Sequence, residues 1–169
     1  MIIYKDFITG DELLSDTYPI KIVHELIYEV QGKLTTESTA VDDKLLGANP
    51  SAEDDAGATA DPSCQSGCNI VLANRLVETS YSKKDFRVYF KKYVGALLKR
   101  VQEEEPARVD SFKKGMMEAL KKIEANFDNW QFFMGESMNP DGMLALMDFR
   151  DDGSPYMWFF KDGLLEEKV

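Results

Sequence analysis

Few residues of this 169-residue chain are of the types that carry out catalysis. The one histidine, His24, lies in a strand-like run, and as a general base it would need a nucleophile and an orienting carboxylate beside it. No serine lies in a nucleophile-elbow pattern, and neither a G-x-x-x-x-G-K-[ST] nor a G-x-G-x-x-G phosphate-binding motif occurs. We therefore interpret His24 as a packed or surface residue and expect a binding protein rather than an enzyme.

The two cysteines, Cys64 and Cys68, are too few to form a metal site of their own. A tetrahedral zinc site needs four ligands, and this C-x-x-x-C pair has no second cysteine pair and no nearby histidine. Two cysteines also cannot form a disulfide framework, and the cytosol would keep them reduced. We interpret both as small residues at the end of a loop, and we expect no required cofactor.

One acidic run superficially suits a calcium loop. Asp148–Gly153 has acids at positions one and five and glycine at six, but Arg150 stands at position three, and Phe159 stands where a bidentate glutamate is required. Asp152-Gly153 is instead a strong signal for a hairpin turn. We predict a turn here, leave the metal ligands unknown, and regard only weak calcium binding by clustered carboxylates as compatible with the sequence.

Charge is distributed unevenly along the chain, whose formal net charge is −10. Residues 82–126 hold 12 Lys and Arg against 7 Asp and Glu, whereas the rest of the chain holds 8 against 23. This pattern indicates one cationic element on an anionic body, so we expect no nucleic-acid partner. The cationic element is either a solvated helix face or a surface that binds an acidic partner.

We expect a cytosolic protein. No apolar run approaches the roughly 20 residues of a membrane span. The opening Met1-Ile2-Ile3-Tyr4-Lys5-Asp6 meets charge at its fifth residue, which does not suit the apolar core of a signal peptide.

Residues 2–31 and 69–77 have the character of short strands. In the first segment, apolar residues alternate with turn signals such as Thr9-Gly10-Asp11, and Pro19 suits the start of a strand. In the second segment, we interpret the apolar run from Asn69 to Asn74 as a strand that continues to about Val77.

Segment 35–67 differs in composition from both. It contains no aromatic residue, seven Asp or Glu and one Lys. Such a segment buries too little apolar area to offset its ordering entropy. We therefore predict a long flexible acidic loop within one domain that spans residues 1–169.

A helical hairpin is predicted over residues 82–126. Ser82 can cap the first helix, with Asp85 three residues later. The run Glu103-Glu104-Glu105-Pro106 interrupts the helical pattern, and a second helix follows it. Apolar residues recur at helical spacing in both parts, at Phe86, Tyr89, Phe90, Tyr93, Leu97 and Val101 and then at Val109, Phe112, Met116, Leu120 and Ile123.

The last part of the chain returns to strands, at Trp130–Glu136, Met143–Phe149 and Tyr156–Lys161. These strands are apolar on both faces, and the helical hairpin is the cover available for one of them. The fold class that follows is α+β. We expect mostly antiparallel twisted β-sheets with an inserted α-helical hairpin and a long flexible acidic loop.

Two long motifs resemble the signatures of the translationally controlled tumour protein family. The first is Gly47-Ala48-Asn49-Pro50-Ser51-Ala52-Glu53, and the second spans Phe127 to Phe149, through Gln131–Glu136 and Asn139–Met143. The opening residues and the run from Tyr156 to Gly163 also look like the ends of family members. The resemblance spans the chain and implies the same kind of fold.

The resemblance also implies partners. Family members are described as binding calcium, tubulin, the small GTPase Rheb, translation elongation factors and anti-apoptotic Bcl-family proteins, and as being secreted without a signal peptide. By resemblance, Asp11 and Glu12 match the position proposed to face the GTPase. The signature residues that carry over are Gly47, Asn49, Pro50, Ser51, Glu53, Gly135 and Glu136.

Two functional hypotheses stay open at this point. The first is a regulatory or adaptor protein that binds small GTPases and elongation factors, with the growth-promoting and anti-apoptotic roles that the resemblance implies. The second is a calcium-responsive, microtubule-associated protein that acts through its basic hairpin, which matches the family segment assigned to tubulin. The hairpin residues proposed for this contact are Lys83, Lys84, Arg87, Lys91 and Lys92.

Overall fold

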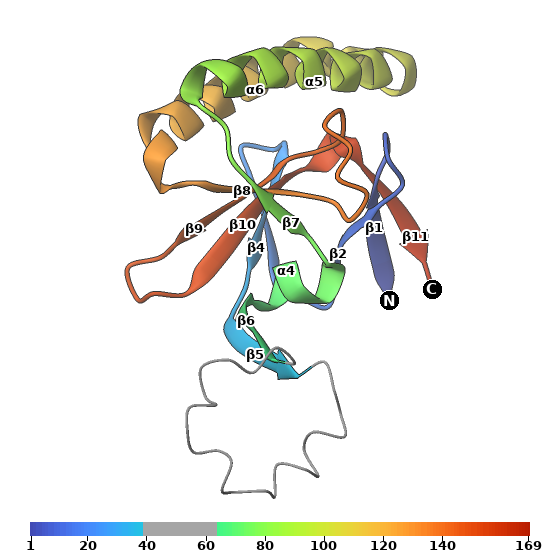
Figure 1. Ribbon diagram of the computed structural model, residues 1–169. Helices are drawn as coiled ribbons and strands as arrows, with labels where there is room; N and C mark the ends of the chain where they lie inside the picture. Colours follow the sequence, from blue (N-terminus) through green and yellow to red (C-terminus); the bar gives the residue numbers. More distant parts are fainter. Residues whose placement is uncertain (39–63) are drawn as a thin grey trace, which may run out of the picture.

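The computed structural model describes residues 1–38 and 64–169. Within these ranges, β-strands form three antiparallel sheets (Figure 1). The largest has the order β3-β4-β10-β9-β8-β7, a smaller one has the order β11-β1-β2, and β5 and β6 form a separate ribbon. The strands are β1 (Ile2–Asp6), β2 (Glu12–Ser15), β3 (Ile20–Val23), β4 (Ile27–Gln31), β5 (Leu34–Ser38), β6 (Cys64–Cys68), β7 (Val77–Thr79), β8 (Gln131–Met134), β9 (Ala145–Phe149), β10 (Pro155–Phe160) and β11 (Leu164–Lys168).

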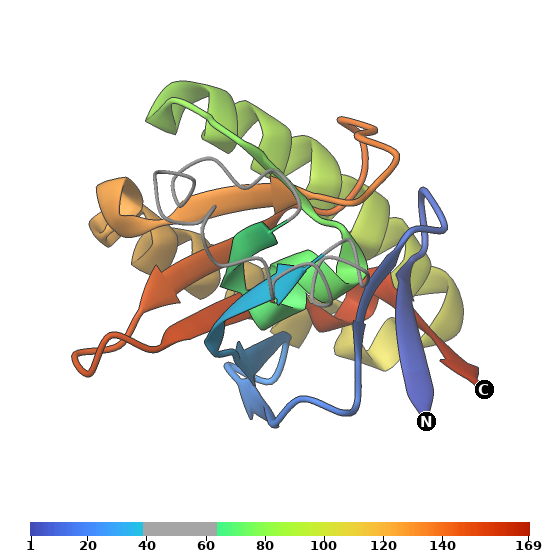
Figure 2. The same cartoon turned by 60° about the horizontal axis from the view of Figure 1, so that its bottom comes forward.

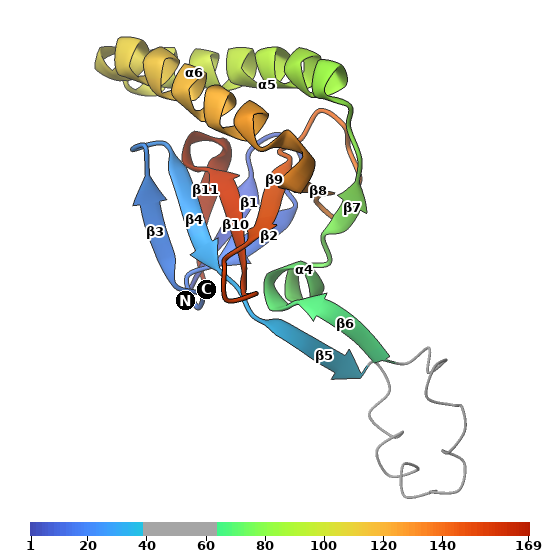
Figure 3. The same ribbon diagram turned by 90° about the vertical axis from the view of Figure 1, so that its left-hand side faces the viewer.

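Two long helices form the predicted hairpin, which lies across one side of the sheets (Figures 1 and 3). These are α5 (Lys83–Glu104) and α6 (Val109–Ala125), joined by the 3₁₀ turn η1 (Pro106–Arg108). The hydroxyl of Ser82 accepts a hydrogen bond from the Asp85 amide at 3.1 Å, so the predicted cap is confirmed. Shorter helical elements are α4 (Asn69–Asn74), η2 (Phe127–Asn129) and η3 (Lys161–Gly163).

Aromatic side chains join the hairpin to the six-stranded sheet. Phe86 of α5 is fully buried, and its ring lies 5.3 Å from that of Phe132 on β8. Farther along the helix, Phe90 and Tyr93 contact Phe160 of β10 at 5.9 and 5.8 Å. The core therefore lies between the apolar stripe of the helices and one face of this sheet.

The two ends of the chain meet beside each other in the small sheet (Figure 2). Strand β11 pairs with β1, from Ile2 opposite Lys168 to Asp6 opposite Leu164. We did not predict a strand at Leu164–Lys168, because the run Leu-Leu-Glu-Glu-Lys does not alternate like a half-buried strand and has no local partner.

The segment 69–77 was predicted as one strand, and this prediction is wrong. Asn69–Asn74 forms helix α4, and only Val77–Thr79 is a strand. The helix fully buries Ile70, and Arg75 ends it in the left-handed conformation with φ 56°. A short apolar run carries too little periodicity to distinguish the two states, which explains the error.

The prediction of a loop over 35–67 needs correction at both ends. Leu34–Ser38 pairs with Cys64–Cys68, from Leu34 opposite Cys68 to Ser38 opposite Cys64. The two cysteines therefore lie in a strand rather than at the end of a loop. Residues 39–63, including the first family signature, lie outside the described residues.

The tight turn between β3 and β4 holds two residues other than glycine at positive φ. His24 has φ 53° and Glu25 has φ 60°, and the amide of Leu26 donates to the Val23 carbonyl at 3.3 Å. Hairpin turns with two left-handed residues favour glycine at the second position, because a Cβ atom is crowded there.

We therefore expect Glu25→Gly to raise the free energy of unfolding by about 0.5–1 kcal/mol, since glycine adopts this φ without strain. Urea denaturation measures the change. The same exchange at exposed Glu118, inside α6, is the control and should instead lower stability by about 1 kcal/mol. An equal loss of stability in both variants would show that the turn stores no strain.

Candidate functional site

The acidic pair predicted from the sequence lies where β2 begins, beside the loop that connects β8 and β9. One carboxylate oxygen of Asp11 accepts hydrogen bonds from the Ser137 amide at 3.2 Å and from the Ser137 hydroxyl at 2.6 Å. A Cβ atom on Gly135 would lie 2.4 Å from the same oxygen. The structure therefore brings Asp11 and Gly135 together, and the carboxylate of Asp11 is occupied in holding the 135–143 loop.

The second acid of the pair has a different environment. Glu12 is exposed and has no ion-pair partner among the residues that the structure describes. Glu136 of the neighbouring loop is ion-paired with Arg75 at 3.4 Å, and both side chains are largely exposed. Glu12 lies opposite Lys5 in the β1–β2 pairing, but Lys5 forms its ion pair with Glu167, so Glu12 remains an exposed carboxylate on an ordered edge. Such a group can attract a cation or compete for a metal ion.

Asp6 fixes the other end of the same loop, and sequence reasoning missed it. Its carboxylate accepts from the Ile8 amide at 2.8 Å and from the Met143 amide at 2.7 Å. The side chain is buried, and Gly142 leaves room for it, because a Cβ there would lie 2.7 Å from the Asp6 oxygen. A buried carboxylate needs such donors, so Asp6 holds the β1–β2 turn against the 135–143 loop.

The hairpin holds this loop from the other side. The hydroxyl of Tyr89 donates to the Gly142 carbonyl at 2.7 Å and accepts from the Leu144 amide at 2.9 Å. Burial raises the pKa of Tyr89 well above its ordinary value, so the phenol stays neutral and keeps both bonds. At the surface, Lys92 pairs with Asp141 at 3.2 Å. The acidic edge and the hairpin are therefore joined through one loop.

The predicted basic residues of the hairpin all lie at the surface, but they are not equally free. Arg87 pairs with Glu124 of α6, and Lys92 is the partner of Asp141. Lys83, Lys84 and Lys91 have no ion-pair partner in the described part of the chain. The same is true of five exposed lysines that the sequence did not single out, namely Lys99, Lys113, Lys114, Lys121 and Lys122.

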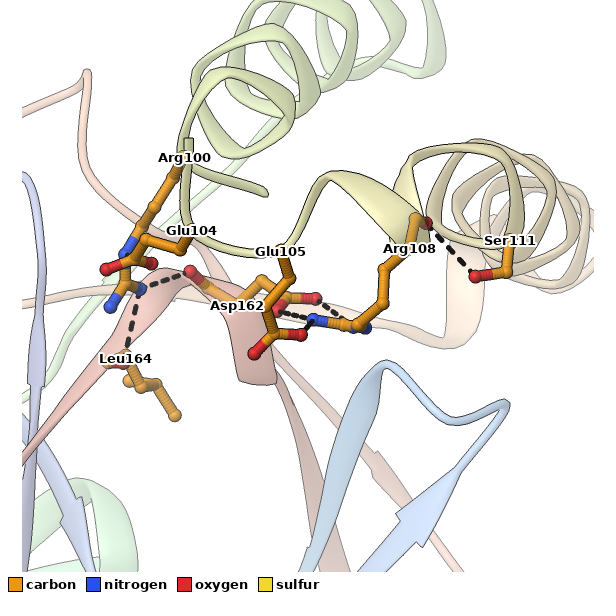
Figure 4. A network of polar contacts seen from close by, with 7 residues as sticks. All are labelled: Arg100, Glu104, Glu105, Arg108, Ser111, Asp162 and Leu164. Atoms are coloured by element: carbon orange, nitrogen blue, oxygen red, sulfur yellow. Dashed lines mark hydrogen bonds and ion pairs between the residues drawn. The ribbon is translucent and has the colours of Figure 1, made fainter. Parts of the chain in front are cut away.

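A charged network fastens the far end of the hairpin to the sheet (Figure 4). The guanidinium of Arg108 donates to both carboxylate oxygens of Asp162, at 2.9 and 3.1 Å, and to Glu105 at 2.9 Å. Arg100 donates to the carbonyl of Asp162 at 2.5 Å and pairs with Glu104 at 3.1 Å. The carboxylates of Asp162 and Glu105 raise the pKa of Arg108 and hold its guanidinium in place. We therefore assign a structural role to this network.

His24 and Cys68 show no reactive arrangement. The His24 ring lies 6.1 Å from the Trp158 ring, edge to face, and the Cys68 thiol is buried, which raises its pKa. In residues 1–38 and 64–169, no group of three or more His, Cys, Asp or Glu side chains could hold a metal ion. Asp148–Gly153 covers the end of β9 and the turn that leads to β10, with Gly153 at φ 89°, which confirms the predicted hairpin turn.

None of the described helices is both long and apolar enough to cross a membrane.

Comparison with known proteins gives the same result by three routes. The family model described as translationally controlled tumour protein matches residues 1–165. The translationally-controlled tumor protein homolog of Branchiostoma belcheri is 50% identical over 169 residues, and that of Mus musculus is 47% identical over 171. Both alignments cover 99% of each chain. The solved structure of the translationally controlled tumor-associated protein p23fyp from Schizosaccharomyces pombe has a TM-score of 0.81 at 46% identity and covers 100% of both chains.

Proposed function

The chain belongs to the translationally controlled tumour protein family, and from this premise we propose that it is a cytosolic regulatory protein that binds a Rheb-like small GTPase. The observation that supports this most is the exposed carboxylate of Glu12, whose cross-strand neighbour Lys5 is ion-paired with Glu167 instead, on an edge that Asp6, Asp11 and Tyr89 hold in place. A carboxylate at this position can draw the nucleotide-bound magnesium ion away from a GTPase electrostatically.

In this proposal the two acids have different roles. Glu12 contacts the partner, whereas Asp11 positions the 135–143 loop through Ser137. We expect the unmodified protein to accelerate nucleotide release from a Rheb-type GTPase, and Glu12→Gln to lose about tenfold of that acceleration without a change in backbone NMR shifts of the loop. Asp11→Asn should also slow release but should move the Ser137 amide resonance.

Glu118→Gln, an exposed acid on α6, serves as the matched control and should leave release unchanged. If the unmodified protein produces no release above the intrinsic rate, the exchange activity is wrong. If Glu12→Gln is as active as the unmodified protein, the assignment of the contact to Glu12 is wrong.

A second candidate function rests on the hairpin. Its eight unpaired, exposed lysines contribute to the net positive charge of the hairpin on an otherwise anionic protein, and the acidic tails of tubulin are complementary to that charge. We expect co-sedimentation with microtubules to fall steeply between 50 and about 200 mM salt, because exposed charges are screened. Lys84→Glu with Lys91→Glu, which reverses the charge of two of these unpaired lysines, should weaken it strongly. Microtubule binding that does not change with salt concentration, or that persists after this charge reversal, would contradict an electrostatic contact.

The remaining partners follow from family membership alone. Translation elongation factors and anti-apoptotic Bcl-family proteins belong to the proposal on that ground, as does secretion without a signal peptide. We further propose that calcium binds only weakly, in the millimolar range that loosely arranged carboxylates give. Titration calorimetry that shows micromolar affinity, or no heat at millimolar calcium, would contradict this.

A further inference from the structure

A groove separates the two chain connections that link the six-stranded sheet to the hairpin. Figure 1 shows these connections, one rising from β7 to α5 and the other descending from α6 to β8. The cavity between them has a volume of about 230 Å³ and adjoins a second cavity of about 520 Å³ that shares Tyr81, Phe127 and Asp128 with it. We call the first cavity the aromatic–acidic groove, after its side chains Glu78, Tyr81, Phe127, Asp128, Trp130 and Phe132.

Aromatic rings give the groove its wall. The ring centroid of Phe132 lies 5.5 Å from that of Phe127 and 6.0 Å from that of Tyr81, and Phe127 and Phe132 rest in turn on buried Phe86. Tyr81 and Phe127 are only partly buried, so their rings remain accessible from the groove. A rigid wall of aromatic faces suits a cation, because the ring quadrupole attracts positive charge.

The charges of the groove point to the same class of ligand. Among the described residues, neither Glu78 nor Asp128 has a cationic partner, and Glu78 accepts only the Gln131 amide at a long 3.4 Å. Lys83, the cation that lines the adjoining cavity, forms no ion pair with either of them. The groove therefore presents two uncompensated carboxylates next to aromatic rings.

The groove also contains a buried hydrogen-bond acceptor. The amide oxygen of Gln131, on the wall beside Glu78, is buried and has no hydrogen-bond partner in the described part of the structure. An unsatisfied buried acceptor is unfavourable, and a small movement of the Gln131 side chain would bring it within reach of the donors of a ligand. This favours a ligand with several N–H donors in one plane over a ligand with a single ammonium group.

We propose that the aromatic–acidic groove binds the side chain of an arginine presented by a partner protein. The guanidinium is planar, so it stacks on aromatic rings, and its five donors can serve Glu78, Asp128 and Gln131 together. An ammonium group matches the charge but neither stacks nor reaches three acceptors in this way. The groove shares no lining residue with the acidic edge, so this binding is distinct from the proposed GTPase contact, and of the lysines proposed for microtubules only Lys83 lines the adjoining cavity.

The probe is the peptide acetyl-Gly-Arg-Gly-amide, titrated into the ¹⁵N-labelled protein and followed by NMR. The two tryptophans give two indole N–H signals, and only Trp130 lines the groove, whereas the Trp158 indole already donates to Glu29 at 3.1 Å. We expect saturable shifts at the Trp130 indole and in residues 78–81 and 127–132, and none with the citrulline peptide, which has the same shape without the charge.

Glu78→Gln combined with Asp128→Asn removes both charges at constant shape and should weaken binding about tenfold. Glu118→Gln with Asp110→Asn, two exposed acids on α6, is the matched control and should bind like the unmodified protein. The proposal is overturned if the citrulline peptide produces the same shifts, if the groove variant keeps its affinity, or if the lysine peptide binds as tightly as the arginine peptide.

Discussion

Replacing Phe86 with alanine is expected to lower the free energy of unfolding by about 3–5 kcal/mol, the usual range for emptying a fully buried phenylalanine site. The Phe86 ring is completely buried and contacts Phe90, Phe127 and Phe132, so it joins α5 to the η2 turn that follows α6 and to strand β8 of the sheet. The surrounding rings are held by one another and can collapse only partly into the cavity. Urea denaturation followed by circular dichroism measures the loss.

The control for this variant is Val88→Ala, two residues away on the same helix. Val88 is 65% exposed, so its truncation should change stability by no more than about 0.5 kcal/mol. Because Phe127 and Phe132 also line the aromatic–acidic groove, Phe86→Ala should loosen the groove as well, and the arginine peptide should bind it less tightly. A loss of stability below about 1.5 kcal/mol would show that the hairpin is fastened mainly elsewhere, as at Arg108 and Asp162.

The hairpin was predictable because its signals are local. Apolar residues at helical spacing, a serine cap at Ser82 and a stop at Pro106 all act within a few residues, and the structure begins and ends the hairpin where they indicate. Helix α4 is too short to show such periodicity, and β11 depends on pairing with β1 at the other end of the chain. We therefore predicted α4 as a strand and did not predict β11.

Part of the candidate site could be selected from the sequence through the family resemblance. The resemblance identified Asp11 and Gly135, and the structure explains their pairing, since the glycine is required by the close approach of the carboxylate. Asp6 and Asp162 could not be selected in this way, because their roles arise from partners far away in sequence, at Met143 and Arg108. Nothing in the residues flanking an aspartate shows whether the fold will bury it.

Gly163 is the position where an added methyl group should be most harmful to the core. A Cβ atom there would lie 2.1 Å from the hydroxyl oxygen of Tyr93 and 2.7 Å from the end of Met143. Met143 can move, but the Tyr93 ring is buried and stacks on Tyr89 at 5.5 Å, so its hydroxyl cannot be displaced cheaply. We expect Gly163→Ala to lower the free energy of unfolding by about 2–3 kcal/mol through overpacking.

A second substitution tests the cause. The Tyr93 hydroxyl is buried and has no hydrogen-bond partner among the described residues, so Tyr93→Phe alone should be nearly neutral or slightly stabilising. Combined with Gly163→Ala, it removes the atom in conflict and should restore about 1–2 kcal/mol, which a double-mutant cycle in urea would measure as coupling. Tyr89→Phe is the control, because that hydroxyl makes two hydrogen bonds, and its removal should add a loss rather than rescue. Purely additive effects of Gly163→Ala and Tyr93→Phe would show that the methyl group is accommodated by a different movement of the chain.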